Sequence, residues 1–295
     1  IAPAGGIEPV KIEAGCKVLN SLGIETAIMP HVLNDNGLPW HASALDNRLS
    51  DFHKALRNNE VDALWCIRGG VGSAMLLPHI DWDLMRSRNL PLIGYSDITA
   101  LHMAMLKENA GTPVAAPMIG KLPEAVNCEF TMKKMRQALA QEKYDICTLT
   151  PISGRQTTAL PVAANLTVMA SVCGTGFVPD TRDKILIIED INEPAYRLDR
   201  CLVQLQQCGV LKHLSGLVLG KFTECGDTKL LDQLFCHWAQ ELDCPVWRGF
   251  PFGHNFPMAS INMSRPISIY PRRRVASRVP DRAFASQDTQ SRDEE

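Results

Sequence analysis

The chain has 295 residues, of which 45% are hydrophobic and 21% are charged, and its formal net charge at pH 7 is -2. This near-average composition excludes disordered, collagen-like and coiled-coil proteins, and the length favours two domains or one large α/β unit. Because the net charge is close to zero, no global electrostatic field attracts nucleic acid or an anionic membrane surface.

The cysteine pattern and the lack of long apolar runs indicate a cytoplasmic protein. The ten cysteines show no C-x-x-C pair, and we interpret them as free thiols of the kind found in the reducing cytosol. No apolar run approaches the roughly 18 to 20 residues of a membrane span, and no signal-peptide pattern opens the sequence. The sequence starts at Ile1 rather than Met, so a removed signal stays open as an alternative.

The first half of the chain alternates short apolar runs with helical periodicity, which is typical of βαβ units around a parallel sheet. The sequence predicts helices over 12–22, 42–58, 98–109 and 131–141, and strands over 25–29, 61–67 and 91–95. The strand over 61–67 runs into the glycine-rich segment 68–73, whose backbone N–H groups can approach a ligand closely.

The second half is predicted to form a separate domain, with strands over 184–188 and 216–219 and helices over 194–208 and 230–241. We therefore predict an α/β protein of two domains. An N-terminal parallel-sheet domain (1–140) is joined by a polar linker (141–160) to a C-terminal mixed β/α domain (161–270). Residues 271–295 lack apolar periodicity and are predicted to be a disordered tail.

Ser96 is the first residue that could carry chemistry. It lies between a predicted buried strand and a helix start, which places its hydroxyl at the carboxyl edge of the sheet beside free helix N–H groups. This is the position of a nucleophile, although the sequence Gly94-Tyr95-Ser96-Asp97 does not match the G-x-S-x-G motif. The alternative is that Ser96 or Asp97 only caps the helix.

The glycine-rich segment 69–72 follows the neighbouring strand, and open α/β sheets bind ligands at the carboxyl ends of such strands. Its backbone N–H groups can stabilise an oxyanion. It does not match a nucleotide-binding loop, because it has no Lys-Ser/Thr pair and Met75 replaces the last glycine of G-x-G-x-x-G. A plain tight turn is the alternative.

Two further candidates lie in the second half. Glu189 follows the apolar run 185–188 and precedes Asp190, and a carboxylate at a strand end can orient a histidine. His254 lies in the Gly/Pro-rich segment 250–255, and loops of this kind carry many functional residues. The alternatives are a solvated acidic pair and a surface histidine. Together the candidates give the chain order Ser, Glu, His.

Five segments in colinear order carry a resemblance to a known family. They are Ile67-Arg68-Gly69-Gly70-Val71-Gly72-Ser73, Ile93-Gly94-Tyr95-Ser96-Asp97-Ile98-Thr99-Ala100-Leu101, Ile188-Glu189-Asp190-Ile191, Tyr196-Arg197-Leu198-Asp199-Arg200 and Pro251-Phe252-Gly253-His254. They resemble the L,D-carboxypeptidase family, whose members are cytoplasmic murein tetrapeptide carboxypeptidases and related microcin C immunity peptidases. The similarity covers about residues 1–265.

The resemblance implies that Ser96 is the nucleophile, His254 the general base and acid, and Glu189 the residue that orients His254. The chemistry of these residue types agrees with those roles. A serine hydroxyl needs a base to be nucleophilic near neutral pH, and the base needs a carboxylate to fix its tautomer.

The resemblance also implies an oxyanion hole made by the backbone N–H groups of Asp97 and of Gly70 or Gly69. Gly69 and Arg68 are expected to contact substrate, since a guanidinium at the mouth of a cleft can pair with a substrate carboxylate. For Arg68 the alternative is a structural ion pair.

The chain departs from the family pattern in three places. Val71 stands where the family usually has an aromatic residue, residues 163–166 (Ala-Ala-Asn-Leu) replace a Gly-Gly-Asn-Leu run, and residues 115–117 (Ala-Ala-Pro) replace His-Gly-Pro. We expect these changes to affect the shape of the substrate site rather than the three proposed catalytic residues.

The predicted function is a serine carboxypeptidase that removes the terminal D-alanine of murein tetrapeptides in peptidoglycan recycling, at a site between the two domains. We expect no metal and no cofactor, because potential ligands do not cluster at metal-binding spacing. The expected partner is a small peptide or muropeptide, with neither nucleic acid nor membrane, and a homodimer is compatible with this prediction. The alternatives are an immunity-type peptidase that cleaves aminoacyl-adenylate mimics and a catalytically silent ligand-binding protein.

Overall fold

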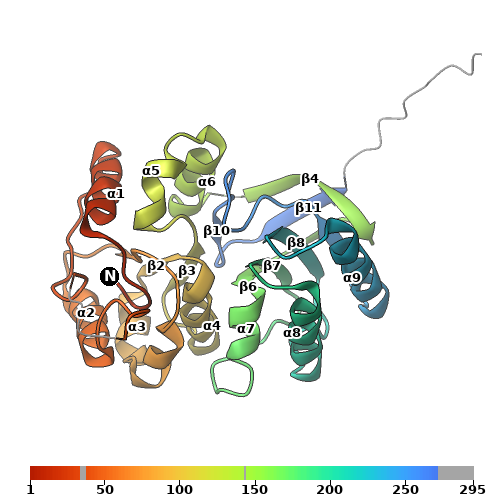
Figure 1. Cartoon of the computed structure of the whole chain (residues 1–295), viewed down its shortest axis with the longest axis horizontal. Helices are drawn as coiled ribbons and strands as arrows, with labels where there is room; N and C mark the ends of the chain where they lie inside the picture. The colour runs from red at the N-terminus through yellow and green to blue at the C-terminus, as the bar shows by residue number, and fades with distance from the viewer. Residues whose placement is uncertain (34–37, 143, 272–295) are drawn as a thin grey trace, which may run out of the picture.

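The computed structural model describes residues 1–33, 38–142 and 144–271. Two β-sheets lie side by side along the long dimension of the molecule, the first built mainly from the first half of the chain and the second from the second half (Figure 1). The first sheet is mostly parallel and the second is mixed. The predicted α/β class with two such halves is confirmed.

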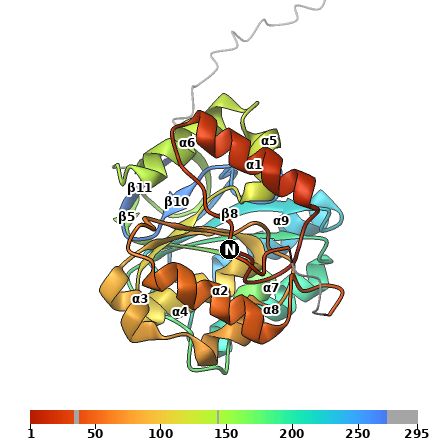
Figure 2. The same cartoon turned by 90° about the vertical axis from the view of Figure 1, so that its left-hand side faces the viewer.

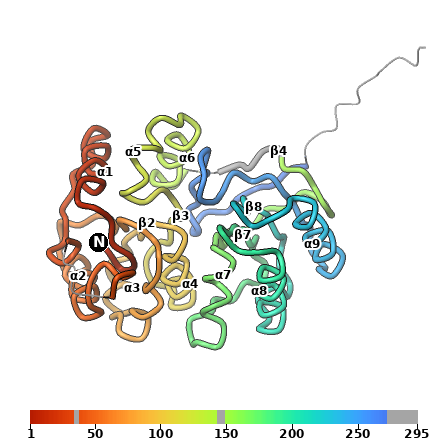
Figure 3. The backbone as a smooth tube through the Cα atoms, in the orientation of Figure 1, coloured from red at the N-terminus to blue at the C-terminus, as the bar shows by residue number. Residues whose placement is uncertain are grey.

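The first sheet has the strand order β1-β2-β3-β10. The strands β1 (Leu64–Trp65), β2 (Pro91–Gly94) and β3 (Thr112–Ala115) are parallel, and β10 (Ile261–Asn262) pairs antiparallel with β3. β10 comes from the last part of the chain, which leaves the second sheet after β9, runs beside β3 and then returns to form β11 (Figure 3).

Helices cover both faces of the first sheet, with α1, α5 and α6 on one side and α2, α3 and α4 on the other (Figure 2). Each uses an apolar face; in α2, for example, Phe52, Ala55 and Leu56 are buried. The bounds are α1 (Pro9–Ser21), α2 (Leu45–Arg57), α3 (Trp82–Arg88), α4 (Thr99–Glu108), α5 (Leu122–Ala125) and α6 (Glu129–Leu139), with 3-10 turns η1 (Ser73–His79), η2 (Ser96–Ile98) and η3 (Ile119–Lys121).

The second sheet has the strand order β5-β11-β4-β9-β8-β7-β6, and the four strands from β9 to β6 are parallel. At its centre, residues 185–190 of β7 are buried throughout, because a parallel strand covered on both faces needs a continuous apolar run. The bounds are β4 (Tyr144–Ser153), β5 (Thr157–Ala159), β6 (Pro161–Asn165), α7 (Leu166–Ser171), β7 (Ile185–Ile191), α8 (Ala195–Gln207), β8 (Gly216–Thr223), α9 (Thr228–Glu241), β9 (Val246–Arg248) and β11 (Ile267–Pro271).

Two sequence predictions are wrong. The segment 141–160, predicted to be a polar linker, contains β4 and β5, which pair with β11 and β9 from the end of the chain and so belong to the second sheet. The strand predicted over 25–29 does not form, because no neighbouring strand pairs with this segment. Of the predicted tail, Pro271 ends β11 and the remaining residues lie outside the described part of the chain.

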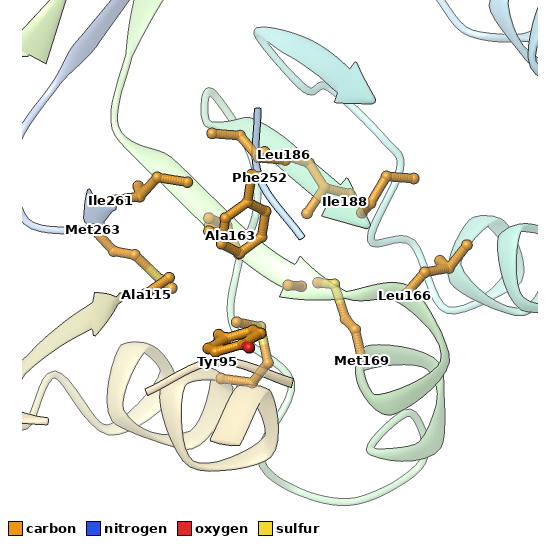
Figure 4. Packing of buried hydrophobic residues seen from close by; sticks show 14 of the residues in the cluster. Tyr95, Ala115, Ala163, Leu166, Met169, Leu186, Ile188, Phe252, Ile261 and Met263 are labelled. Carbon is orange, nitrogen blue, oxygen red and sulfur yellow. The ribbon is translucent and has the colours of Figure 1, made fainter. Parts of the chain in front are cut away.

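One apolar core runs through both sheets and fixes their relative position near Ser96. Tyr95 is the last residue before Ser96 and belongs to the same buried cluster as Ala163 of β6 and Phe252, which follows β9 (Figure 4). All three side chains are buried. Because buried apolar packing is close-packed and resists displacement, the end of β2 is held against the second sheet.

None of the helices in residues 1–33, 38–142 and 144–271 has the length and apolar content that crossing a bilayer requires.

Candidate active site

Ser96 occupies a sharp turn between β2 and the 3-10 turn that leads into α4. Its φ of +63° lies in the left-handed region, which is costly for a residue other than glycine and is typical of functional turns. Gly94 makes this turn feasible, since a Cβ there would lie 2.9 Å from Ile98 Cγ1. The turn therefore places the Ser96 hydroxyl at the carboxyl end of a buried parallel strand, as predicted.

His254 connects Ser96 with Glu189 through its two ring nitrogens. Its Nε2 lies 3.0 Å from Ser96 Oγ and its Nδ1 lies 2.8 Å from Glu189 Oε2. The ring also packs edge-on against Tyr95, with ring centroids 5.1 Å apart. The three candidates predicted from sequence are thus brought together, although 158 residues separate Ser96 from His254.

Glu189 is fully buried at the end of β7. Its second carboxylate oxygen, Oε1, accepts a hydrogen bond of 3.2 Å from Asn165 Nδ2. Burial raises the pKa of the Glu189 carboxyl above its ordinary value, and the adjacent Asp190 charge adds to this, while the contacts with His254 and Asn165 oppose it. The carboxylate is therefore a desolvated acceptor with a fixed orientation, not a member of a solvated acidic pair.

Asp190 points away from His254, into a separate set of donors. Its Oδ2 accepts from the backbone N–H and the hydroxyl of Thr167, at 2.9 and 2.7 Å, and its Oδ1 accepts from Asn165 Nδ2 at 3.0 Å. The Asn165 side chain therefore bridges the two carboxylates. Asn165 was not predicted to be a site residue, although it lies at the end of β6 and matches the Asn of the family's Gly-Gly-Asn-Leu run.

The glycine-rich loop packs directly on Ser96. A Cβ built on Gly69 would lie 3.0 Å from Ser96 Oγ and 3.3 Å from the backbone nitrogen of Asp97. Gly70 has a φ of +102°, a conformation that side-chain-bearing residues rarely adopt. Neither the Asp97 N–H nor the Gly70 N–H has an acceptor within the described residues, so both donors are available to an oxyanion.

Buried polar contacts hold this loop against the turn at Ser96. The Ser73 N–H donates to the Asp97 carboxylate at 2.9 Å, and the Ser73 hydroxyl donates to the Asp97 carbonyl at 2.6 Å. Arg48, only 3% exposed, donates to the carbonyls of Gly72 and Pro3 at 2.9 and 2.7 Å. Sequence analysis missed Arg48, because it lies in an ordinary polar-faced helix.

Arg68 lies at the exposed edge of the same loop. Its Nη1 donates to the Gly6 carbonyl at 2.9 Å. None of the ion pairs of the described residues includes Arg68, so the structural ion pair considered from the sequence is absent there. The remaining guanidinium donors can bind an anion.

The departures from the family pattern fall into two groups. The alanines at 115, 116, 163 and 164 are buried in the apolar core at the ends of β3 and β6. Val71 is 45% exposed on the glycine-rich loop. Of these five positions, Val71 is therefore the one with an exposed side chain, and the four alanines are packed in the core.

We expect Gly69→Ala to lower turnover roughly 100-fold, because the added methyl group would displace Ser96 and a shift of about 1 Å at a reacting atom can cost that much. The measurements are kcat on a peptide substrate and the rate of fluorophosphonate labelling. Gly176→Ala is the control, since a Cβ there meets nothing within 4 Å. Equal turnover in the two variants would contradict the assigned contact.

A hydroxyl, an imidazole and a buried carboxylate in this order, beside unpaired backbone N–H groups, form the arrangement that serine hydrolases use. Within the described part of the chain, no cluster of three or more His, Cys, Asp and Glu side chains is arranged to hold a metal ion. The fold and the site are those of a serine hydrolase, and the serine, the imidazole and the carboxylate of the site come from two α/β halves.

Comparison with known proteins identifies the family. The LD-carboxypeptidase N-terminal domain matches residues 1–115, and the LD-carboxypeptidase C-terminal domain matches residues 159–269. The chain belongs to the LD-carboxypeptidase family and is a serine carboxypeptidase.

Two relatives and two solved structures illustrate the similarity. The chain is 31% identical to a probable murein peptide carboxypeptidase of Bacillus subtilis, covering 88% of this chain and 84% of the relative. It is 30% identical to the murein tetrapeptide carboxypeptidase of Pseudomonas aeruginosa, covering 86% of each. A muramoyltetrapeptide carboxypeptidase from Oxalobacter formigenes superimposes with a TM-score of 0.76 at 26% identity, covering 89% of this chain and 92% of that one. An MccF-like protein from Bacillus anthracis shares the fold, with a TM-score of 0.84 at 22% identity over 92% of each chain.

Proposed function

We propose that Ser96 is the nucleophile, His254 the general base and acid, and Glu189 the carboxylate that orients His254. One observation carries this proposal, namely that a single imidazole contacts the serine hydroxyl at 3.0 Å and the buried carboxylate at 2.8 Å. This geometry lets the imidazole accept the hydroxyl proton while the carboxylate stabilises the resulting charge.

In the proposed reaction, Ser96 Oγ attacks the carbonyl carbon of the scissile peptide bond, and its proton passes to Nε2 of His254. The carbonyl oxygen becomes an anion that accepts hydrogen bonds from the N–H groups of Asp97 and Gly70 or its neighbour Gly69. His254 then protonates the leaving amine, which departs from an acyl-enzyme. Water activated by His254 hydrolyses the ester and restores the serine.

The proposed substrate is a murein tetrapeptide, from which the enzyme would release the terminal D-alanine. Support comes from the two relatives named above, which match most of this chain. A carboxypeptidase must also recognise a free carboxylate, and the Arg68 guanidinium beside the glycine-rich loop can pair with one. Such a substrate would place the enzyme in cytoplasmic peptidoglycan recycling.

Three substrates separate the proposed function from its alternatives. We expect release of D-alanine from a murein tetrapeptide and no release from its all-L analogue. Aspartyl sulfamoyl adenosine, the compound bound in a solved MccF structure, is the third substrate. Cleavage of that compound without cleavage of the tetrapeptide would favour an immunity-type peptidase. A protein that cleaves none of them and resists fluorophosphonate labelling would be catalytically silent.

The peptide is the proposed partner, and neither nucleic acid nor a membrane enters the reaction. The net charge of -2 provides no general attraction for either polyanion. A homodimer is compatible with the proposal, and analytical ultracentrifugation of the purified protein would measure the oligomeric state.

We expect activity to survive prolonged incubation with EDTA, because every step of the proposed reaction uses groups of the chain itself. The measurement is the rate of D-alanine release before and after chelation. Loss of activity with EDTA and its return with added zinc would mean that a metal supplies the nucleophile or the Lewis acid, and the serine mechanism would be wrong.

A further inference from the structure

Lys221 lies in an irregular part of β8, directly beside Glu189. Ile188 of β7 pairs with Leu219, whereas Asp190 pairs with Phe222, so two residues of β8 oppose the single residue Glu189. This is a β-bulge, and bulges beside active sites turn a side chain out of the regular alternation. Here the bulge consists of Gly220 and Lys221.

Glycine at position 220 allows the bulge to approach the segment that carries His254. A Cβ there would lie 2.6 Å from the Phe252 carbonyl oxygen and 3.2 Å from Glu189 Cβ. The backbone N–H of Lys221 then donates to that same Phe252 carbonyl at 2.8 Å. The bulge is thus fixed to the residue two positions before His254.

The Lys221 side chain is fixed to the other side of His254. Its Nζ donates to the backbone carbonyl of Asn255 at 2.7 Å and to that of Pro257 at 2.8 Å. Together with the backbone bond to Phe252, these contacts hold the histidine segment both before and after the imidazole.

Besides the Lys221 contacts, this segment is held by its buried ends, by a hydrogen bond of 3.4 Å from Asn255 Nδ2 to Thr223 Oγ1, and by Phe256, which packs against the apolar core. Phe252 and Met258 are each 1% exposed and act as anchors. Gly253 has no side chain, and its φ of +147° is a conformation that favours glycine. A Cβ at this position would lie 2.9 Å from Lys221 Cβ. The Lys221 contacts therefore restrain the part of the chain on which the position of His254 depends.

The Lys221 ammonium group loses part of its hydration in this position, which costs free energy. Burial lowers the pKa of Lys221 below its ordinary value. None of the ion pairs of the described residues includes Lys221, so carbonyl dipoles rather than a carboxylate replace its lost water. A half-buried lysine without a counter-ion adds little to the stability of the fold, because removing its charge from water costs free energy. Its presence here therefore favours a role in positioning.

We propose that Lys221 is a positioning residue that holds segment 252–257 so that His254 keeps its contacts with Ser96 and Glu189. The proposal rests on the catalytic roles given above. Lys221 does not touch the reacting atoms, and it acts on the rate through the placement of the imidazole.

The test compares Lys221→Met with Lys221→Arg. Methionine keeps the apolar stem and removes the donors, so we expect kcat to fall roughly 10- to 100-fold with KM within about twofold of the wild type. The rate of fluorophosphonate labelling should fall by the same factor, because it also depends on His254 activating Ser96. Arginine keeps the donors and should recover part of both rates.

Lys212→Met is the matched control, because Lys212 is an exposed lysine on the same half of the protein. It should leave both rates unchanged, and all three variants should melt as the wild type does. Unchanged kcat in Lys221→Met would overturn the proposal. So would a raised KM at unchanged kcat, which would indicate substrate binding, or a rate loss matched by a loss of folded protein.

Labelling also separates this proposal from the choice of substrate. If the wild type reacts with the fluorophosphonate but does not cleave the tetrapeptide, the substrate assignment fails and the effect of Lys221 can still be measured. If Lys221→Met labels as fast as the wild type, the positioning role fails whatever the substrate is.

Discussion

Replacing Ser96 by alanine is expected to lower turnover roughly 10⁴- to 10⁶-fold and to leave the fold intact. Alanine removes the only atom that bonds to the substrate carbonyl in the proposed reaction. The core beside it is unaffected, since Tyr95 and Ile98 carry the buried contacts at this turn. The measurements are D-alanine release from the murein tetrapeptide and the melting temperature.

The alanine variant should also lose fluorophosphonate labelling, and mass spectrometry of the labelled wild type should locate the adduct on Ser96. Ser87→Ala is the control, because the Ser87 hydroxyl is exposed on α3 and bonds only to the Leu84 carbonyl in the described structure. Near-normal turnover in Ser96→Ala, or an adduct on another serine, would remove Ser96 from the mechanism.

The parts of the fold that sequence analysis predicted correctly are those whose signal is local. The apolar run of β7 and the one-sided apolar face of α8, with Leu198, Leu202 and Leu205 buried, depend only on neighbouring residues. The strands β4 and β5 were missed because their partners are β11 and β9, more than 90 residues away along the chain. The strand over 25–29 was predicted from its composition, but a strand needs a partner.

The residues of the site also divide into those with a local signal in the sequence and those whose contacts come from distant segments. Ser96 and Glu189 were selected as candidates because each follows a predicted buried strand, and His254 because it lies in a Gly/Pro-rich loop. Asn165, Arg48 and Lys221 were missed, although each makes two or more hydrogen bonds around the site. Their role depends on backbone carbonyls and carboxylates contributed by distant segments, and a single sequence does not record those contacts.

His254→Ala should cost nearly as much turnover as the double variant Ser96→Ala/His254→Ala. The physical reason is that the imidazole activates the hydroxyl, so either loss removes the same step. Steady-state kinetics of the two single variants and the double variant test this. If the double loss equals the product of two large independent fold-changes, the residues do not act as one unit.

Glu189→Gln should cost less turnover than His254→Ala, roughly 10²- to 10⁴-fold, because the base remains but its tautomer is no longer fixed by a carboxylate. It should not lower the melting temperature. Burial raises the pKa of Glu189, so the ionised carboxylate lowers the free energy of unfolding. This loss of stability is fully present when the pH exceeds the folded-state pKa. Glutamine removes the buried charge and with it that cost.

Asp190→Asn separates the carboxylate that contacts His254 from the one that holds β7 to α7. The Asp190 oxygens face donors from Thr167 and Asn165, so an amide NH₂ group in their place meets another donor and should destabilise the protein by about 1–3 kcal/mol. Turnover below the melting transition should change little, because Asp190 does not reach His254. The two substitutions should therefore have opposite profiles, with Glu189→Gln losing turnover at unchanged stability and Asp190→Asn losing stability at nearly unchanged turnover. A larger loss of turnover in Asp190→Asn than in Glu189→Gln would assign the orienting role to the other carboxylate.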